Sequence, residues 1–187
     1  MLNRRGALAG FSGAAGLIAS APALGQKPRR MRPQEGDVLV HAFGERAGAT
    51  LAAGDVGPRP VAAYAMDPAS GIVRDGSLNN QLLVVRVAGD DVSSKASRYA
   101  VPDAPGTDVL LVYSASCTHT GCEINGWDDE TRRLKCPCHD SQFDVADAAR
   151  VVNGPAPRPL AMLRVALTDG ALRVTGGFSR RVGPEPP

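Results

Sequence analysis

The feature that most constrains this chain is a stretch from Cys117 to Asp144 that contains all four cysteines and two of the three histidines. The stretch opens with the residues C-T-H-T-G-C and closes with C-P-C-H-D-S-Q-F-D. Each half therefore offers cysteine and histidine side chains at short spacing. A site built from two thiolates and two imidazoles suits Zn²⁺ or iron. The pattern indicates a metal site to which two parts of the chain contribute.

A zinc ribbon or knuckle is the simplest structural alternative. A closed zinc site takes four ligands, usually cysteine and histidine. Zinc would leave two thiols unexplained, because this stretch supplies more candidates than zinc needs: Cys117, His119, Cys122, Cys136, Cys138 and His139.

The two halves together resemble the loops of the Rieske family, which hold a [2Fe–2S] cluster with two cysteines on one iron and two histidines on the other. The resemblance implies that Cys117 and Cys136 bind the inner iron. It implies that His119 and His139 bind the outer iron. The expected cofactor is therefore a Rieske-type [2Fe–2S] cluster.

Two further features are implied by the same resemblance. The remaining pair, Cys122 and Cys138, matches the disulfide that joins the two loops in the high-potential branch of the family. The run from Asn153 to Leu160 is similar to the proline loop that covers the cluster on its third side, although alone it would be an ordinary turn. The covering residues in that loop would be Gly154, Pro155, Ala156 and Pro157.

Residues near the second motif bear on the reduction potential and on the type of complex. The most oxidising Rieske proteins carry a serine and a tyrosine there, and both donate hydrogen bonds to cluster sulfurs. Ser141 matches the serine, whereas Phe143 stands at the tyrosine position and has no donor. Asp140 replaces a usual glycine, and Thr120 stands where quinol-oxidising complexes usually carry leucine. These departures favour a subunit resembling the small chain of arsenite oxidase.

The resemblance implies a one-electron carrier. The first hypothesis is an exported electron-transfer subunit of a periplasmic oxidoreductase, partnered with the catalytic subunit, a c-type cytochrome or both. The alternative is the Rieske subunit of a membrane quinol:cytochrome c reductase. A ferredoxin of an oxygenase system is disfavoured, because such ferredoxins lack the disulfide pair and the export leader. We find no separate nucleophile–base arrangement, so no independent catalytic site is evident.

Composition limits the remaining classes of function. The 187 residues leave room for one domain and a leader. A net charge of +2 and only 4% aromatic residues argue against a nucleic-acid partner. The 21 glycines and 15 prolines suit short strands joined by many turns.

The first residues predict a targeting signal. Arg4 and Arg5 precede an uncharged run rich in alanine and glycine, which is typical of a twin-arginine export signal over residues 1–25. We expect cleavage near residues 21–26 and a periplasmic location, with membrane attachment only if the leader is retained as an anchor. Residues 26–36 are basic and contain proline, so we interpret them as a disordered linker.

Residues 37–187 are predicted to form the Rieske domain, an all-β antiparallel sandwich or small barrel. A small cluster-binding subdomain, about residues 115–160, is expected to protrude from one end. Lone His41 is interpreted as a core or surface histidine rather than a ligand, and Trp127 as packing under the loops. Residues 45–77 are left without an assigned role. The predicted strands, short and rich in valine and leucine, are Val38–Ala42, Val61–Ala65, Leu82–Val87, Val109–Ser114, Arg132–Lys135, Gln142–Asp144, Arg150–Val152, Met162–Leu167 and Ala171–Thr175.

Overall fold

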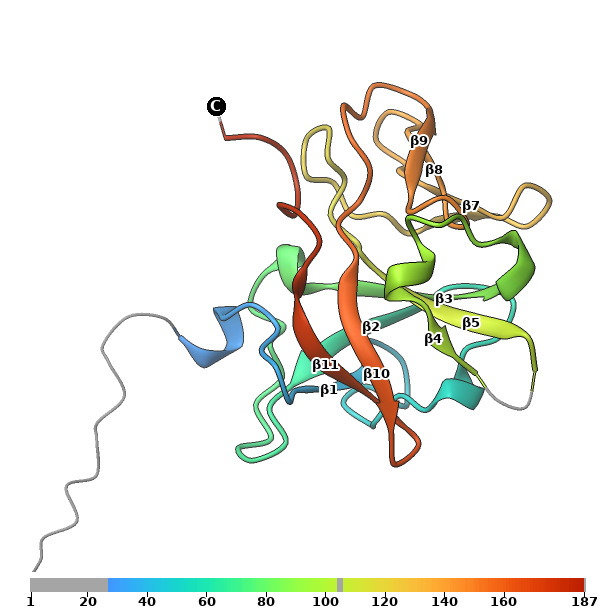
Figure 1. Cartoon of the computed structure of the whole chain (residues 1–187). Coiled ribbons are helices and arrows are strands. Elements are labelled where there is room, and N and C mark those ends of the chain that lie inside the picture. Colours follow the sequence, from blue (N-terminus) through green and yellow to red (C-terminus); the bar gives the residue numbers. More distant parts are fainter. Residues whose placement is uncertain (1–26, 104–105, 187) are drawn as a thin grey trace, which may run out of the picture.

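The computed structural model describes residues 27–103 and 106–186, and these form two antiparallel sheets (Figure 1). The predicted leader lies outside the described residues. The larger sheet has seven strands in the order β10-β11-β1-β2-β3-β5-β4. Its strands are β1 (Val38–His41), β2 (Val61–Met66), β3 (Leu82–Ala88), β4 (Val101–Pro102), β5 (Asp108–Ser114), β10 (Leu163–Thr168) and β11 (Ala171–Phe178).

The larger sheet curls until its two edges meet. Tyr113 in β5 forms an antiparallel bridge with Met162, directly before β10. The amide of Ser114 donates to the carbonyl of Ala161 at 2.8 Å. These bonds bring the β10 edge beside β5 and β4, so the sheet becomes a near-barrel. The predicted all-β class is therefore confirmed.

The smaller sheet lies between β5 and β10 in the sequence and above one end of the near-barrel in Figure 1. It has four strands in the order β6-β7-β8-β9. Their bounds are β6 (Gly126–Asp128), β7 (Arg133–Lys135), β8 (Gln142–Asp144) and β9 (Arg150–Asn153).

In the described part of the chain, the helices are all short 3-10 turns of three residues. None of them has the length and apolar character that crossing a membrane requires. They are η1 (Pro28–Arg30), η2 (Ala53–Asp55), η3 (Leu78–Asn80), η4 (Gly89–Asp91) and η5 (Ser97–Tyr99).

Strands β3 and β5 are buried on both faces, and this connects the two sheets. Alternate residues of a strand point to opposite faces. One face of β3 and β5 packs inside the near-barrel, through side chains such as Val84 and Leu110. The other face packs under the smaller sheet, where Leu83 and Tyr113 join one buried cluster with Phe143. The smaller sheet therefore packs on the outer face of β3 and β5, whose inner face belongs to the core of the near-barrel.

The β10–β11 hairpin closes through a two-residue turn. Thr168 pairs with Ala171, and the two residues between them are Asp169 and Gly170. Both have positive φ, 52° and 76°, as a type I′ turn requires. An Asp-Gly dipeptide is among those that favour this turn.

The expectation of a disordered linker is wrong for residues 27–36, which pack against the near-barrel. Arg29 makes a bidentate ion pair with Asp75, with Nε to Oδ1 at 2.6 Å. The side-chain amide of Asn80 donates to the carbonyl of Met31 at 2.7 Å. The basic residues of this segment therefore find partners more than forty positions away, which composition alone does not reveal.

Candidate metal centre

The first loop of the site begins directly after β5 and closes on itself. The amide of Cys117 donates to the carbonyl of Cys122 at 2.9 Å. The amide of Gly121 donates back to the carbonyl of Cys117 at 3.0 Å. Gly121 has φ +83°, a left-handed conformation that glycine adopts without strain. The loop thus presents Cys117 inward, where it is 1% exposed, and leaves His119 half-buried at the surface.

The second loop joins β7 to β8 and is closed in the same way. The amide of Cys136 donates to the carbonyl of Ser141 at 2.9 Å. Asp140 has φ +53°, which non-glycine residues adopt rarely and aspartate more readily than most. This geometry gives a reason for the usual glycine at that position. The Asp140 side chain is 63% exposed and lies 3.8 Å from Lys135 Nζ, so water and a cation offset its charge.

A third segment, the predicted proline loop, packs against the second loop. Gly154 has φ +82°, and a Cβ atom on it would lie 2.5 Å from Ser141 Cα. Only glycine therefore allows this approach. The amide of Ala156 donates to Ser141 Oγ at 3.1 Å, and Asn153 donates to the carbonyl of Asp140 at 3.1 Å.

The third segment is also bonded to the first loop. Thr118 stands between Cys117 and His119 in the sequence, and its side chain is buried. Its hydroxyl donates to the carbonyl of Arg158 at 2.7 Å. Sequence analysis missed this contact, because a threonine within a motif gives no signal of its distant partner.

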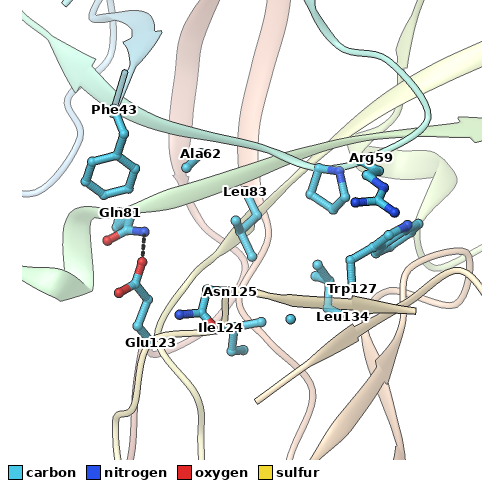
Figure 2. A pocket seen from close by; sticks show the side chains of 12 residues that line it. Phe43, Arg59, Ala62, Gln81, Leu83, Glu123, Ile124, Asn125, Trp127 and Leu134 are labelled. Carbon is cyan, nitrogen blue, oxygen red and sulfur yellow. Dashed lines mark hydrogen bonds between the residues drawn. The ribbon is translucent and has the colours of Figure 1, made fainter. Parts of the chain in front are cut away.

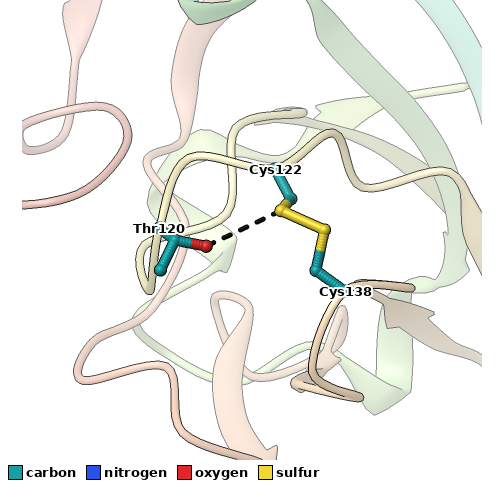
Figure 3. The surroundings of a disulfide bond; sticks show 3 residues. All are labelled: Thr120, Cys122 and Cys138. Carbon is teal, nitrogen blue, oxygen red and sulfur yellow. Dashed lines mark hydrogen bonds between the residues drawn. A yellow bond between two sulfur atoms is a disulfide. The ribbon is translucent and has the colours of Figure 1, made fainter.

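The predicted disulfide between Cys122 and Cys138 is present and ties the first loop to the second (Figure 3). The Cα atoms of the two cysteines are 6.6 Å apart. The Thr120 hydroxyl lies 3.6 Å from Cys122 Sγ. The sulfurs of Cys122, Cys136 and Cys138 lie within 4.8 Å of one another, so the disulfide borders the Cys136 thiol. Because disulfide sulfurs are not thiolates, Cys122 and Cys138 are unsuitable as ligands.

Cys117 and Cys136 are free thiols, buried next to each other in the core beneath the smaller sheet. Burial raises the pKa of the Cys117 thiol to about 11, and the neighbouring Cys136 also raises it, whereas a hydrogen bond with Ser141 acts in the opposite direction. The Cys117 thiol would thus stay neutral unless a cation compensates its ionisation. A coordinated metal does this, because a coordinating thiol is deprotonated outright.

The two histidines of the site face each other. The rings of His119 and His139 have centroids 4.7 Å apart and are nearly perpendicular, at 86°. Nδ1 of His119 is buried and has no hydrogen-bond partner among the described residues. A buried imidazole nitrogen without a partner is costly, and binding to a metal satisfies it. The donor set of two free thiols and two imidazoles therefore fits a mixed Cys₂His₂ metal centre.

The two other residues singled out in the sequence lie away from this donor set. His41 is a satisfied histidine, as predicted: its side chain is 11% exposed and its Nε2 lies 3.3 Å from Asp55 Oδ2. Trp127 lies on β6, pairs with Leu134 on β7 and is half-buried against the core under the smaller sheet. It lines a pocket of about 330 Å³ between the two sheets, together with Arg59 and Leu83 (Figure 2).

The stretch that contains the site residues matches a known protein family. The family described as "Rieske [2Fe-2S] domain" matches residues 70–164, about half of the chain. The "Cytochrome bc1 complex Rieske iron-sulfur subunit" of Streptomyces lividans is 38% identical over 104 residues, which are 55% of this chain and 58% of the relative. The subunit of the same name from Corynebacterium glutamicum is 41% identical over 106 residues, which are 56% of this chain and 26% of the relative.

A protein of Haloferax mediterranei, provisionally named as the Rieske subunit of a respiratory nitrate reductase, is 41% identical over 90 residues. The match covers 46% of this chain and 40% of that protein. The chain thus spans between about a quarter and three fifths of the length of these three relatives. Among solved structures, the soluble domain of Rieske protein II from Sulfolobus acidocaldarius has a TM-score of 0.40 at 22% identity, over 55% of this chain and 66% of that one.

Proposed function

Since this chain belongs to the Rieske [2Fe-2S] family, we propose that it is the electron-carrying subunit of a respiratory oxidoreductase and that Cys117, His119, Cys136 and His139 hold its cluster. Family membership itself implies a Rieske-type [2Fe–2S] cofactor and a role as an electron carrier. When bound, such a cluster supplies one-electron transfer at a potential of roughly −150 to +300 mV.

Two observations support the ligand assignment: Cys117 and Cys136 are buried free thiols, and Nδ1 of His119 is buried without a hydrogen-bond partner among the described residues. In this assignment Cys117 and Cys136 act as thiolates. His119 binds through Nδ1, and His139 supplies the second imidazole. The disulfide and the third segment hold the loops that carry these ligands.

The histidines also give the site a route for protons. His139 is exposed and His119 is half-buried at the surface. The ring nitrogen of each that does not bind metal can therefore exchange a proton with solvent. Each ring, if bound to a metal, would hold this proton more tightly when the site gains an electron. We therefore expect reduction to be coupled to proton uptake at that nitrogen.

The complex that we favour is a quinol:cytochrome c reductase of the bc1 type. The relatives support this alternative over our first hypothesis, because two of the three are named as bc1 subunits. We further propose that the twin-arginine pair at Arg4 and Arg5 directs export of the folded domain, which would place it at the outer face of the membrane.

A periplasmic oxidoreductase is the second candidate, and three residues favour it. Thr120 occupies the loop tip where quinol-oxidising complexes usually carry leucine. Phe143 stands where the most oxidising Rieske proteins carry tyrosine, and Asp140 stands where glycine is usual. The relative named for a nitrate reductase provides a parallel for such a partner.

Deletion of the gene distinguishes the two candidates. Membranes of the deletion strain should lose quinol:cytochrome c reductase activity, and expression of the intact chain should restore it. Unchanged activity, with the tagged protein purifying together with a soluble oxidoreductase, would exclude the bc1 assignment. Absence of a rhombic Rieske EPR signal from the purified, reduced wild-type protein would instead overturn the proposal of a cluster carrier.

A further inference from the structure

The segment after β11 lies against the first loop of the site. We call residues 181–185 of this segment the strap; in Figure 1 it is the dark red chain that rises beside the loop following β5. Gly183 has φ +73°, and a Cβ atom on it would lie 2.9 Å from Ser116 Oγ. A Cβ atom on Gly121 would lie 3.2 Å from Pro184 Cδ. The strap therefore touches the residue before Cys117 and the residue before Cys122.

The side chain of Arg158 binds the strap. Its Nη1 donates to the carbonyl of Arg181 at 2.8 Å, and its Nη2 donates to the carbonyl of Gly183. Its Nε lies 3.5 Å from Glu185 Oε1, which adds an electrostatic attraction. The Arg158 side chain is only 19% exposed, whereas that of Glu185 is 72% exposed, so the bonds to the two carbonyls are the better-buried part of this contact.

The main chain of Arg158 contacts the first loop directly. Its carbonyl accepts the hydroxyl of Thr118, the residue between Cys117 and His119. One residue of the third segment thus binds the first loop through its backbone and binds the strap through its guanidinium.

We propose that Arg158 is a positioning residue, which uses the strap to hold the first loop in the geometry that retains the metal centre. This inference rests on the proposed function, because it assumes that Cys117 and His119 are ligands. A planar guanidinium suits the role, since its fixed donors can reach two carbonyls at once, whereas lysine offers a single flexible ammonium. Loss of Arg158 would leave two carbonyls without their donors and release the strap from the loop.

The first test compares Arg158→Met with Arg150→Met. Arg150 serves as a control because it is also a cation of the smaller sheet, on β9, but its ion pairs are with Asp144 and Asp147 rather than with the strap. Two readouts are followed in the cluster-loaded protein: the rate at which a chelator removes iron, and the rate at which a thiol reductant opens Cys122–Cys138. Loss of even one hydrogen bond from a charged donor corresponds to about a tenfold change in equilibrium. We therefore expect both rates to rise about tenfold or more in Arg158→Met. Arg150→Met should match wild type.

Arg158→Lys and Gly183→Ala separate positioning from charge. Lysine keeps the charge but cannot donate to both carbonyls at once, so we expect the two rates in Arg158→Lys to fall only part of the way back to wild-type values. Gly183→Ala would push the strap away from Ser116 and from Asn79 Oδ1, 2.8 Å from the added Cβ, without removing the Arg158 side chain, and it should resemble Arg158→Met. Gly170→Ala is its control, because Gly170 also has a positive φ, +76°, but its added Cβ would contact nothing within 4 Å.

The outcomes distinguish this inference from the proposed function. Full recovery by Arg158→Lys would show that charge alone matters and would overturn the positioning role. Wild-type rates in Arg158→Met, with a normal EPR signal, would overturn it too, while leaving the cluster assignment intact. If Arg158→Met and Gly183→Ala each accelerate both reactions, the double variant should add little, because residues acting through one contact are non-additive. Fully additive effects would mean that Arg158 does not act through the strap.

Discussion

The buried hydroxyl of Ser141 is expected to raise the reduction potential of the site, and Ser141→Ala should lower it. Ser141 is 0% exposed, and its Oγ already accepts the amide of Ala156 at 3.1 Å. The hydroxyl proton is therefore free to be donated elsewhere. A bond from Ser141 lowers the pKa of the Cys117 thiol, so the donor is directed at the proposed ligands. Such a donor stabilises the more negative, reduced state.

The magnitude follows from the strength of a hydrogen bond to a charged acceptor. Such a bond contributes about 1.5–3 kcal/mol. A one-electron couple moves about 59 mV for each tenfold change in equilibrium, so the whole bond would correspond to roughly 65–130 mV. Only the difference between the two redox states counts. We therefore expect Ser141→Ala to lower the potential by roughly 50–100 mV.

Protein-film voltammetry measures this shift directly, and EPR confirms that the cluster is intact. Ser116→Ala is the matched control, because Ser116 is also buried and precedes Cys117, but its hydroxyl has no partner among the described residues. We expect its potential to stay near wild type. An unchanged potential in Ser141→Ala, with a normal EPR signal, would mean that this hydroxyl does not donate toward the cluster.

Four further outcomes follow from the same site. His119→Ala should abolish the rhombic EPR signal because it removes the buried Nδ1, and a full signal would contradict the ligand assignment. Cys122→Ser should still bind the cluster but lose it faster on heating, since a disulfide that closes a loop of roughly 15 residues contributes about 3 kcal/mol. Equal cluster lifetimes would mean that the cross-link is unimportant. Phe143→Tyr should raise the potential by roughly 50–100 mV if its hydroxyl reaches a cluster sulfur, and an unchanged or lower potential would show that residue 143 does not face the cluster. Arg4→Lys combined with Arg5→Lys should leave cluster-loaded protein in the cytoplasm, whereas normal export in cell fractionation would exclude the twin-arginine route.

The strands were predictable from the sequence because most are apolar runs that end at turn residues. Each predicted strand overlaps an observed one, and Gln142–Asp144 has the same bounds as β8. Two strands were missed. β4 is two residues long and includes Pro102, and β6 is the tripeptide from Gly126 to Asp128, in which two of three residues disfavour strands. Their pairing with β5 and β7 decides their conformation, and local sequence does not encode it.

The contacts that were not predictable are those between distant parts of the chain. The cysteine and histidine motifs carry their spacing in the sequence, so the donor set could be named. Arg29 and Arg158, in contrast, look like ordinary surface cations. One pairs with Asp75, 46 positions away, and the other bonds the backbone of Arg181 and Gly183. A bond to a backbone carbonyl leaves no pattern in the sequence, because any residue supplies that acceptor.

Tyr113 explains how a site made of loops can stay rigid. The side chain is fully buried on β5, and its hydroxyl donates to the carbonyl of Val145 at 2.7 Å. Burial raises the pKa of Tyr113 far above its ordinary value, so the hydroxyl remains a donor at any pH at which the protein works. Tyr113 thus ties the near-barrel to the chain directly after β8, which carries Phe143, while Ser141 and the disulfide tie the loops together. An environment whose dipoles are already oriented costs no reorganisation when charge changes. For an electron carrier this rigidity matters, because a site that keeps its geometry in both redox states can gain or lose an electron without moving its backbone.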